Sequence, residues 1–197
     1  MYLSKGNKKL KSTDCVKFLI WNLPAVKTCP NATALCRKSC YARKAEKVYP
    51  SVLPCRENNL NESRQADFVE KMISAIQKNK DHRTLIVRIH ESGDFYNAEY
   101  AKKWLDIATA CPDVVFMAYT KSFKYFDGVK LPKNFFLRAS VWADTKPEDL
   151  ETIARNKWTI YTAVEEMTKG FTECRCDDCG TCGKCWSRTK KIACRIH

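Results

Sequence analysis

The segment LIVRIHESGDF, residues 85–95, decides the fold. Its first five residues form a short apolar run rich in Ile and Val, which is typical of a buried strand, and a polar turn containing Gly93 follows at once. Comparable strand-like runs occupy residues 18–23, 114–119, 135–139 and 158–164. Helical spacing of apolar residues separates them at 68–76, 97–110 and 147–156.

Strands that alternate with helices predict a parallel sheet with right-handed crossovers. A closed eight-stranded barrel usually needs about 250 residues, and this chain has 197. We therefore predict an α/β fold, a partial (open) TIM-like (β/α) barrel with about five or six parallel strands. Residues 1–170 would form this partial barrel with an N-terminal cysteine loop. Residues 171–197, with no clear strand or helix pattern, would be a cysteine-rich metal-binding appendage packed on the same domain.

The first group of cysteines, Cys29, Cys36 and Cys40, follows the first expected strand. Cys36 and Cys40 are four residues apart, so a helix would place both on one side, and Cys29 can reach them from the preceding loop. Three thiolates suit a [4Fe–4S] cluster with one open iron, or an incomplete zinc site. The alternative is three buried thiols that act as small apolar side chains.

The second group lies in the tail, where two residues separate each cysteine from the next. The four cysteines of this run are Cys176, Cys179, Cys182 and Cys185. The spacing resembles the run of bacterial-type ferredoxins and favours iron–sulfur over zinc. Cys174 and Cys194 are further candidate ligands.

The twelve cysteines point to metal rather than disulfides, because the chain looks intracellular, where thiols stay reduced. Its basic start lacks the apolar stretch of a signal peptide. No apolar run approaches the roughly 18 residues of a membrane span, so we expect no membrane partner.

The formal charge of +13 is concentrated at the two cysteine-rich ends. Residues 1–47 hold eleven Lys or Arg against two acids, and the tail from 171 holds six against three. A basic surface of this kind favours a polyanion such as nucleic acid as partner. A solvated surface explains the same charge equally well.

Ligands of parallel sheets gather at the carboxyl ends of the strands, and both cysteine groups follow such ends. We therefore expect the tail to fold back beside Cys29, Cys36 and Cys40. The Ser92-Gly93-Asp94 turn belongs to the same end, where Asp94 could hold an amine or hydroxyl. An ordinary turn in which Gly93 has a positive φ is the alternative.

Four segments together resemble the phage gene-product-88 family over about residues 15–190. They are TCPNAT at 28–33 with Cys36 and Cys40-Tyr-Ala, RIHESGDF at 88–95, YTKS at 119–122, and the terminal cysteine run ending at Trp186. The biochemical role of that family is poorly defined, so the resemblance implies a phage or mobile-element protein and little more.

A wider similarity connects the chain to radical S-adenosylmethionine (radical SAM) enzymes, which have partial (β/α) barrels and a cysteine loop after the first strand. It implies cofactor-binding roles for Tyr41, Ser92, Gly93 and Asp94. The chain departs from that pattern at Arg43, where those enzymes have their third cysteine, so Cys29 would have to replace it.

The sequence thus predicts a radical-SAM-like iron–sulfur protein that catalyses redox or radical chemistry in the cytoplasm of the host cell. One or two [4Fe–4S] clusters would be held by Cys29, Cys36 and Cys40 and by the four tail cysteines. S-adenosylmethionine is a candidate cofactor, and ferredoxin or flavodoxin a candidate electron donor. The sequence identifies no catalytic residue. The alternative is a zinc-stabilised nucleic-acid-binding module without catalysis.

Overall fold

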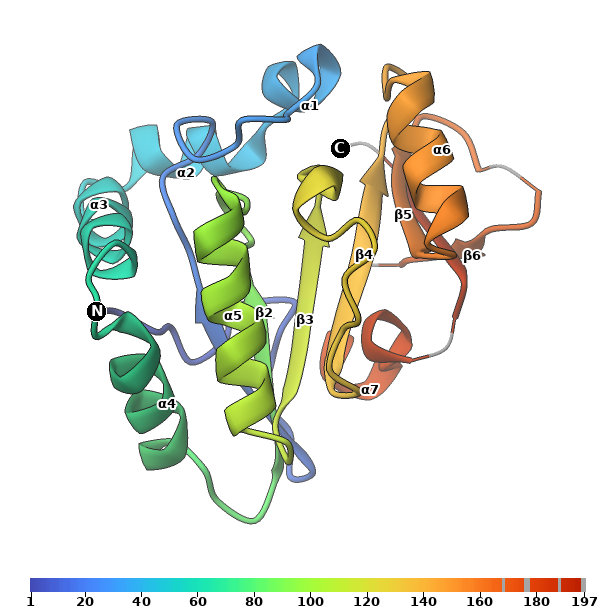
Figure 1. Cartoon of the computed structure of the whole chain (residues 1–197). Coiled ribbons are helices and arrows are strands. Elements are labelled where there is room, and N and C mark those ends of the chain that lie inside the picture. The colour runs from blue at the N-terminus through green and yellow to red at the C-terminus, as the bar shows by residue number, and fades with distance from the viewer. Residues whose placement is uncertain (168, 176–177, 188, 196–197) are drawn as a thin grey trace.

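The computed structural model describes residues 1–167, 169–175, 178–187 and 189–195 (Figure 1). The strands are β1 Val16–Trp21, β2 Thr84–Ile89, β3 Val115–Thr120, β4 Phe135–Val141, β5 Thr159–Val164, β6 Thr172–Glu173 and β7 Lys191–Arg195. The helices are α1 Ala34–Lys38, α2 Tyr41–Val48, α3 Val52–Ser63, α4 Phe68–Lys78, α5 Ala98–Ala110, α6 Pro147–Arg155 and α7 Cys179–Cys182, with 3₁₀ turns η1 Phe123–Tyr125 and η2 Lys184–Trp186.

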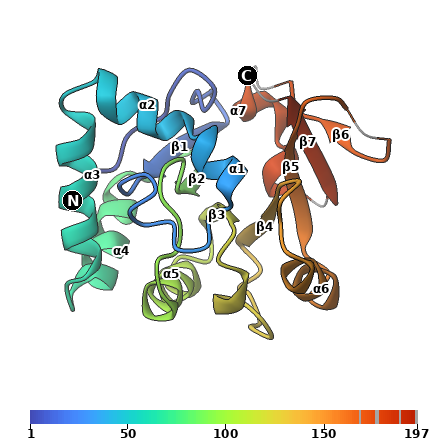
Figure 2. The same ribbon diagram turned by 90° about the horizontal axis from the view of Figure 1, so that it is seen from above.

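All seven strands pair in parallel in one sheet of order β1-β2-β3-β4-β5-β7-β6. The predicted α/β class with a parallel sheet is confirmed, and the sheet is not closed. Because β1 to β5 follow chain order, right-handed crossovers place their helices on one side. Figure 2 shows α4, α5 and α6 in a row along that side. We call the opposite side of the sheet the tail face.

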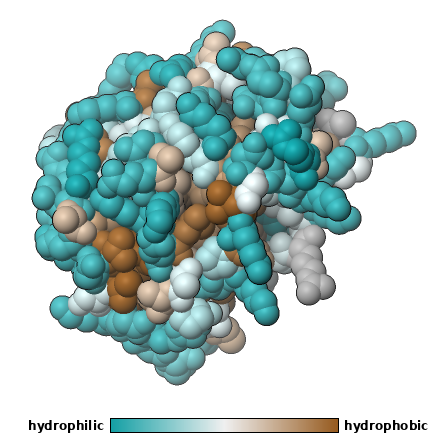
Figure 3. Space-filling view, in the orientation of Figure 1, coloured by the Kyte–Doolittle hydropathy of each residue, from teal (hydrophilic) through white to brown (hydrophobic). Residues whose placement is uncertain are grey.

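Strand side chains alternate between these two sides, as the pleat requires. Leu19 and Trp21 of β1 join the main core under α4 and α5, together with Trp104 of α5. Phe18 and Ile20 point to the tail face, where they form a second, smaller cluster. In Figure 3 hydrophilic residues cover most of the visible surface, and apolar residues gather near its middle.

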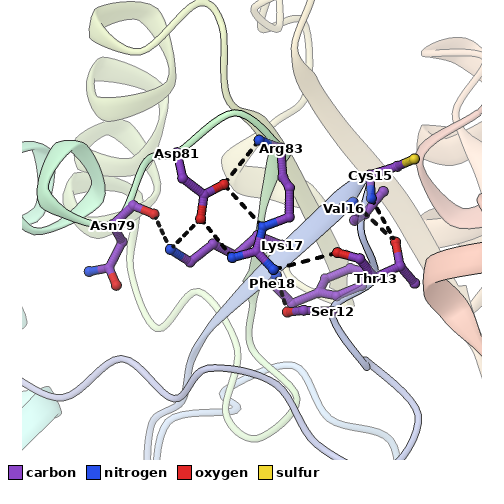
Figure 4. Close-up of polar contacts among 9 residues, drawn as sticks. All are labelled: Ser12, Thr13, Cys15, Val16, Lys17, Phe18, Asn79, Asp81 and Arg83. Atoms are coloured by element: carbon purple, nitrogen blue, oxygen red, sulfur yellow. Dashed lines mark hydrogen bonds and ion pairs between the residues drawn. The ribbon is translucent and has the colours of Figure 1, made fainter.

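A carboxylate fixes the amino ends of β1 and β2 (Figure 4). Asp81 accepts hydrogen bonds from Arg83 Nη2 at 2.6 Å and from Lys17 Nζ at 3.1 Å. Just before β1, the Thr13 hydroxyl accepts a hydrogen bond from the Val16 amide at 3.1 Å. Both groups hold the register that pairs Val16 with Thr84.

The five predicted strands and the three predicted helices are present, with β1 starting two residues earlier than expected. Two regions differ from the prediction. Residues 34–63 form three helices that we did not predict. The longest of them, α3, buries only Asn59, Leu60 and Ser63, so it shows no apolar period in the sequence. Residues 165–197 contain β6, α7, η2 and β7, elements of two to five residues that are too short to show a period. Among the described residues, every helix is too short or too polar to cross a membrane.

His90 follows β2 in a left-handed conformation with φ 62° and is buried in the main core. Tyr100 connects it to β1, because the Tyr100 hydroxyl lies 2.9 Å from both Trp21 Nε1 and His90 Nε2. An indole nitrogen only donates, so the Tyr100 hydroxyl accepts that bond, and a second hydrogen bond joins it to His90 Nε2. Burial, aided by the charge of Arg88, lowers the pKa of His90 from 6.5 to about 3. His90 is therefore a neutral, structural histidine.

This network predicts a loss of stability in mild acid. The unfolded chain protonates His90 below pH 6.5, whereas the folded chain resists until about pH 3, so stability falls as the pH drops through this window. Between pH 7 and pH 5 the loss from this residue is about 2 kcal/mol. Urea denaturation at both pH values should show that the His90→Gln variant lacks this part of the loss. The exposed His82 is the control, and an equal slope in His90→Gln and His82→Gln would contradict the assignment.

Candidate functional site

The loop after β1 carries the first cysteine group above the carboxyl ends of the strands (Figure 1). Thr33 begins α1, since its hydroxyl accepts a hydrogen bond from the Cys36 amide at 3.2 Å. Arg37 ties the loop together by donating from Nε to the Ala32 carbonyl at 3.1 Å and from Nη2 to the Cys29 carbonyl at 3.3 Å. The backbone thus holds Cys29 and Cys36 in one compact turn.

The thiol of Cys29 lies in an environment that keeps it protonated. Burial raises its pKa to about 12, the charge of Asp94 acts in the same direction, and Cys36 and Cys40 would raise it further if they were ionised. The three loop thiols are thus electrostatic neighbours. Deprotonating them together requires a cation, because thiolates crowded without one repel each other.

The Ser-Gly-Asp turn supports this loop from below. The Ser92 hydroxyl donates to the Leu23 carbonyl at 2.8 Å. Gly93 has φ +87°, and a Cβ there would lie 2.6 Å from Thr28 Oγ1 and 2.7 Å from Leu23 Cβ. Only glycine fits at this position.

Asp94 is buried, and its carboxylate holds three neighbours. It accepts hydrogen bonds from the Thr120 hydroxyl at 2.6 Å, from the Lys121 amide at 2.9 Å and from its neighbour Phe95 at 2.7 Å. Burial nevertheless raises its pKa above the ordinary value. Asp94 thus connects the end of β3 to the cysteine loop, and its predicted contact with a cofactor stays a prediction.

Tyr41 lies at the start of α2, immediately after Cys40. Its hydroxyl donates to the Glu91 carbonyl at 2.6 Å, although the residue remains 66% exposed. The hydrogen bond holds the ring in place at the rim of the loop. The cofactor-binding role that we predicted for Tyr41 also stays a prediction.

The cysteine-rich tail covers the tail face of the sheet. The Cys179 amide donates to the Lys9 carbonyl at 2.9 Å, and Trp186 packs edge-on against Phe18 at 5.6 Å between ring centroids. Asp178 caps α7 by accepting from the Gly180 amide at 2.9 Å. The described part of the tail therefore lies across the sheet, next to the segment that precedes β1. We expected it beside Cys29, Cys36 and Cys40 at the carboxyl edge, and this placement was wrong.

Arg138 of β4 anchors the tail. Its side chain is 1% exposed and donates to the carbonyls of Lys184, Cys185, Ser187 and Thr189 at 2.6 to 3.3 Å. Burial lowers the pKa of this guanidinium. One strand residue thus satisfies four carbonyls of the turn that contains Cys185.

Two tyrosines of the sheet donate hydrogen bonds to cysteine sulfurs. The Tyr119 hydroxyl lies 2.6 Å from Cys185 Sγ, and the Tyr161 hydroxyl lies 2.8 Å from Cys194 Sγ. Burial raises the pKa of both tyrosines well above 10, so both hydroxyls keep their protons. Their rings also pack together, with centroids 4.6 Å apart.

Four tail cysteines line one cavity of about 360 Å³. They are Cys174, Cys179, Cys182 and Cys185, and Lys184 and Trp186 contribute to the same wall. Cys176, the first of the predicted ligands in the tail, lies outside the described residues. Within the described part of the chain, no three Cys, His, Asp or Glu side chains approach closely enough to hold a metal ion as they stand.

The sequence prediction thus named the cysteines but missed the sheet residues around them. The prediction overlooked Arg138, Tyr119 and Tyr161, which contact the tail. A charged residue inside the apolar run FFLRAS, residues 135–140, was the available signal for Arg138. Tyr119 opens the segment YTKS of the family resemblance, but no signal marks the contact of either tyrosine with a cysteine, because aromatic residues are common in strands.

Comparisons with known proteins give one family and two phage relatives. The model of the family described as Gene product 88 matches residues 1–188. The Gene 88 protein of Mycobacterium phage L5 is 37% identical over 102 residues, which are 48% of this chain and 43% of that protein. The corresponding protein of Mycobacterium phage D29 is 35% identical over 102 residues, 48% of this chain and 42% of that protein. The match spans less than half the length of these relatives. No solved structure matches the chain.

The crowding at Gly93 predicts a large effect of one methyl group. Gly93→Ala should lower the free energy of unfolding by roughly 2–4 kcal/mol, because it combines a positive φ with overpacking against Thr28 and Leu23. Gly128→Ala is the matched control, since Gly128 has φ +69° with open space around it and should cost only about 1 kcal/mol. Denaturant unfolding measures both. Equal losses would show that Gly93 is not a close-packing position.

Proposed function

The chain belongs to the gene product 88 family, and we propose that it is an iron–sulfur protein with redox activity. The observation that carries the proposal is the row of four cysteines along one cavity of the tail face. The loop cysteines Cys29, Cys36 and Cys40 would form a second centre at the carboxyl edge. Because its relatives are phage proteins, we propose that this protein works in the cytoplasm of the host cell, where thiols stay reduced.

The donor set of the cavity supports iron–sulfur chemistry. Thiolates are the ligands that hold such clusters, and four of them suffice for one. A cavity of about 360 Å³ has room for several atoms, whereas a single bound water takes about 30 Å³. The described side chains must still close in by rotation to bind, because they do not form a ligand set as they stand.

The surroundings of the cavity also support the proposal. The hydroxyl of Tyr119 donates to Cys185 Sγ, and hydrogen bonds to the sulfurs are one means by which proteins set cluster potentials. Arg138 and Arg88 add two buried guanidinium groups on this side of the sheet. Within the described residues neither forms an ion pair with a carboxylate, so thiolates are the natural source of balancing charge.

Metal analysis tests the proposal. The chain purified without oxygen should be brown and contain iron and acid-labile sulfide. Cys182→Ser should remove the tail cluster and Cys36→Ser the loop cluster, each lowering iron and sulfide by about four atoms per chain. Cys111→Ala is the control, because Cys111 lies buried at the end of α5, in the core under the helices. A colourless chain with stoichiometric zinc, as expected for a zinc-stabilised module, would refute the proposal.

A narrower version of the proposal adds radical SAM chemistry at the loop. Three cysteines leave one iron of a [4Fe–4S] cluster without a protein ligand, and a bound cofactor could take that position. Such a cluster supplies single electrons when bound, delivered by a carrier such as ferredoxin or flavodoxin. The role of this chain would be to hold the cofactor with Tyr41 and the Ser92-Gly93-Asp94 turn.

Titration calorimetry of the oxygen-free protein tests this version. S-adenosylmethionine should bind to the wild type and not to Cys36→Ala. The control is Cys182→Ser, which should keep binding because it changes only the tail. If wild-type protein with its full iron content binds no S-adenosylmethionine, the radical version fails and the iron–sulfur proposal stands.

A further inference from the structure

Exposed aromatic and cationic side chains share the outer side of α2 and its C-cap. We call this set the α2 patch: Tyr41, Arg43, Lys44, Lys47 and Tyr49. Tyr41 is 66% exposed and Tyr49 is 59% exposed. Figure 2, viewed from above, shows α2 near the edge of the molecule. Both rings leave much of their surface in solvent, although burial of the Tyr41 hydroxyl raises its pKa to about 12. Two such rings at the ends of one helix need an explanation.

The helix geometry places Tyr41, Arg43, Lys44 and Lys47 away from the buried Ala42, and the exposed Tyr49 follows as the extended C-cap. α2 turns Ala42 into the protein, so residues three and four positions apart along the remaining surface are neighbours. Tyr41 lies above Lys44, and Arg43 lies above Lys47. Eight residues at a helical rise of 1.5 Å each put the backbones of the two tyrosines about 12 Å apart along the helix axis, which is comparable to the rise of three or four nucleotides in one strand.

The cations of the patch are not neutralised within the protein. Among the residues that the structure describes, Arg43, Lys44 and Lys47 make no ion pair and no side-chain hydrogen bond. The one acid of α2, Glu46, already binds Arg56 at 2.8 Å and accepts from the Ala25 amide at 2.7 Å. Three positive charges therefore face solvent between the two rings.

The ring of Tyr41 is also held in position. Its hydroxyl donates to the Glu91 carbonyl at 2.6 Å, so the ring stays fixed while its surface remains open. A fixed and exposed ring loses little freedom when a flat partner stacks on it. Base stacking on aromatic side chains combined with phosphate contacts is how proteins bind single strands.

We propose that the α2 patch binds single-stranded nucleic acid. The bases stack on Tyr41 and Tyr49, and the phosphates lie along Arg43, Lys44 and Lys47. Duplex DNA offers the phosphates but hides the faces of its bases, so the rings favour an unpaired strand. The inference rests on the surface of α2 alone and holds whether or not the cysteines bind iron.

Fluorescence anisotropy with labelled 12-nucleotide single strands of DNA and of RNA tests the proposal. The full-length chain should bind a single strand at least tenfold more tightly than a 12-base-pair duplex. The affinity should fall as the salt concentration rises. The double variant with Arg43→Gln and Lys44→Gln should have a slope of log K against log salt concentration that is smaller in magnitude by about 1.4, because two phosphate contacts are lost. Whichever of DNA or RNA binds more tightly identifies the strand.

Matched variants separate the patch from general charge. Tyr49→Leu should weaken binding about tenfold, whereas Tyr49→Phe should keep it because the ring remains. Lys130→Gln with Lys133→Gln removes the same charge from the loop that leads into β4, where both lysines are exposed, and should leave affinity within twofold. The proposal would be overturned if the Arg43/Lys44 and Lys130/Lys133 double variants lost the same affinity. Equal affinity for single strand and duplex, or no binding at 50 mM salt, would also overturn it. Iron content measured on the same samples shows that a failure here is separate from a failure of the iron–sulfur proposal.

Discussion

A parallel sheet with all its crossover helices on one side leaves its other side bare, and the rest of this structure depends on that constraint. Phe18, Ile86 and Met117 would face water there without a cover. The tail supplies the cover, but its turn brings backbone carbonyls into a buried place, where each must find a donor. Arg138 resolves this conflict with one guanidinium group that serves four of them. The same contact of Arg138 places the turn that contains Cys185 on the sheet.

Arg88 is a second buried cation on the tail face, beside Tyr119. Its guanidinium carbon lies 3.7 Å above the centre of the Tyr119 ring, and Tyr119 in turn donates to Cys185. Burial raises the pKa of Tyr41, the neighbour of Cys40 in the loop, to about 12, and the charge of Arg88 opposes this rise. Arg88 is 7% exposed, and within the described residues its Nη1 has no hydrogen-bond partner. A buried cation in that position favours negative charge beside it, so ionisation of a neighbouring tail thiol would lower the penalty of burying it.

How much the sequence predicts depends on the length of each element. The strands of five or more apolar residues, such as Val115–Thr120, were predictable because burial on both sides leaves a nearly continuous apolar run. Lys191–Arg195 was not, because only Ile192 and Ala193 are buried and two residues show no period. The placement of Cys29, Cys36 and Cys40 in one loop after β1 followed from their order in the sequence, and their binding of one metal centre stays a prediction. The side of the sheet taken by the tail did not, because it depends on Arg138, whose partners are backbone atoms that any sequence provides.

The tail must cover the sheet and, under the iron–sulfur proposal, also hold a cluster. Because it has few residues for both, metal binding and folding are connected. Its apolar contacts with the sheet are few, mainly Trp186, Cys185 and Ile192. Short elements of this size rarely hold together by apolar burial alone, and small cysteine-rich segments usually obtain their remaining stability from metal–thiolate bonds. Under the iron–sulfur proposal, the bonds that close the cavity would also keep the cover on the sheet. Binding and folding of the tail would then be one equilibrium, to which the sheet contributes Arg138, Tyr119 and the pairing of β5 with β7, and the metal contributes its bonds to the thiolates.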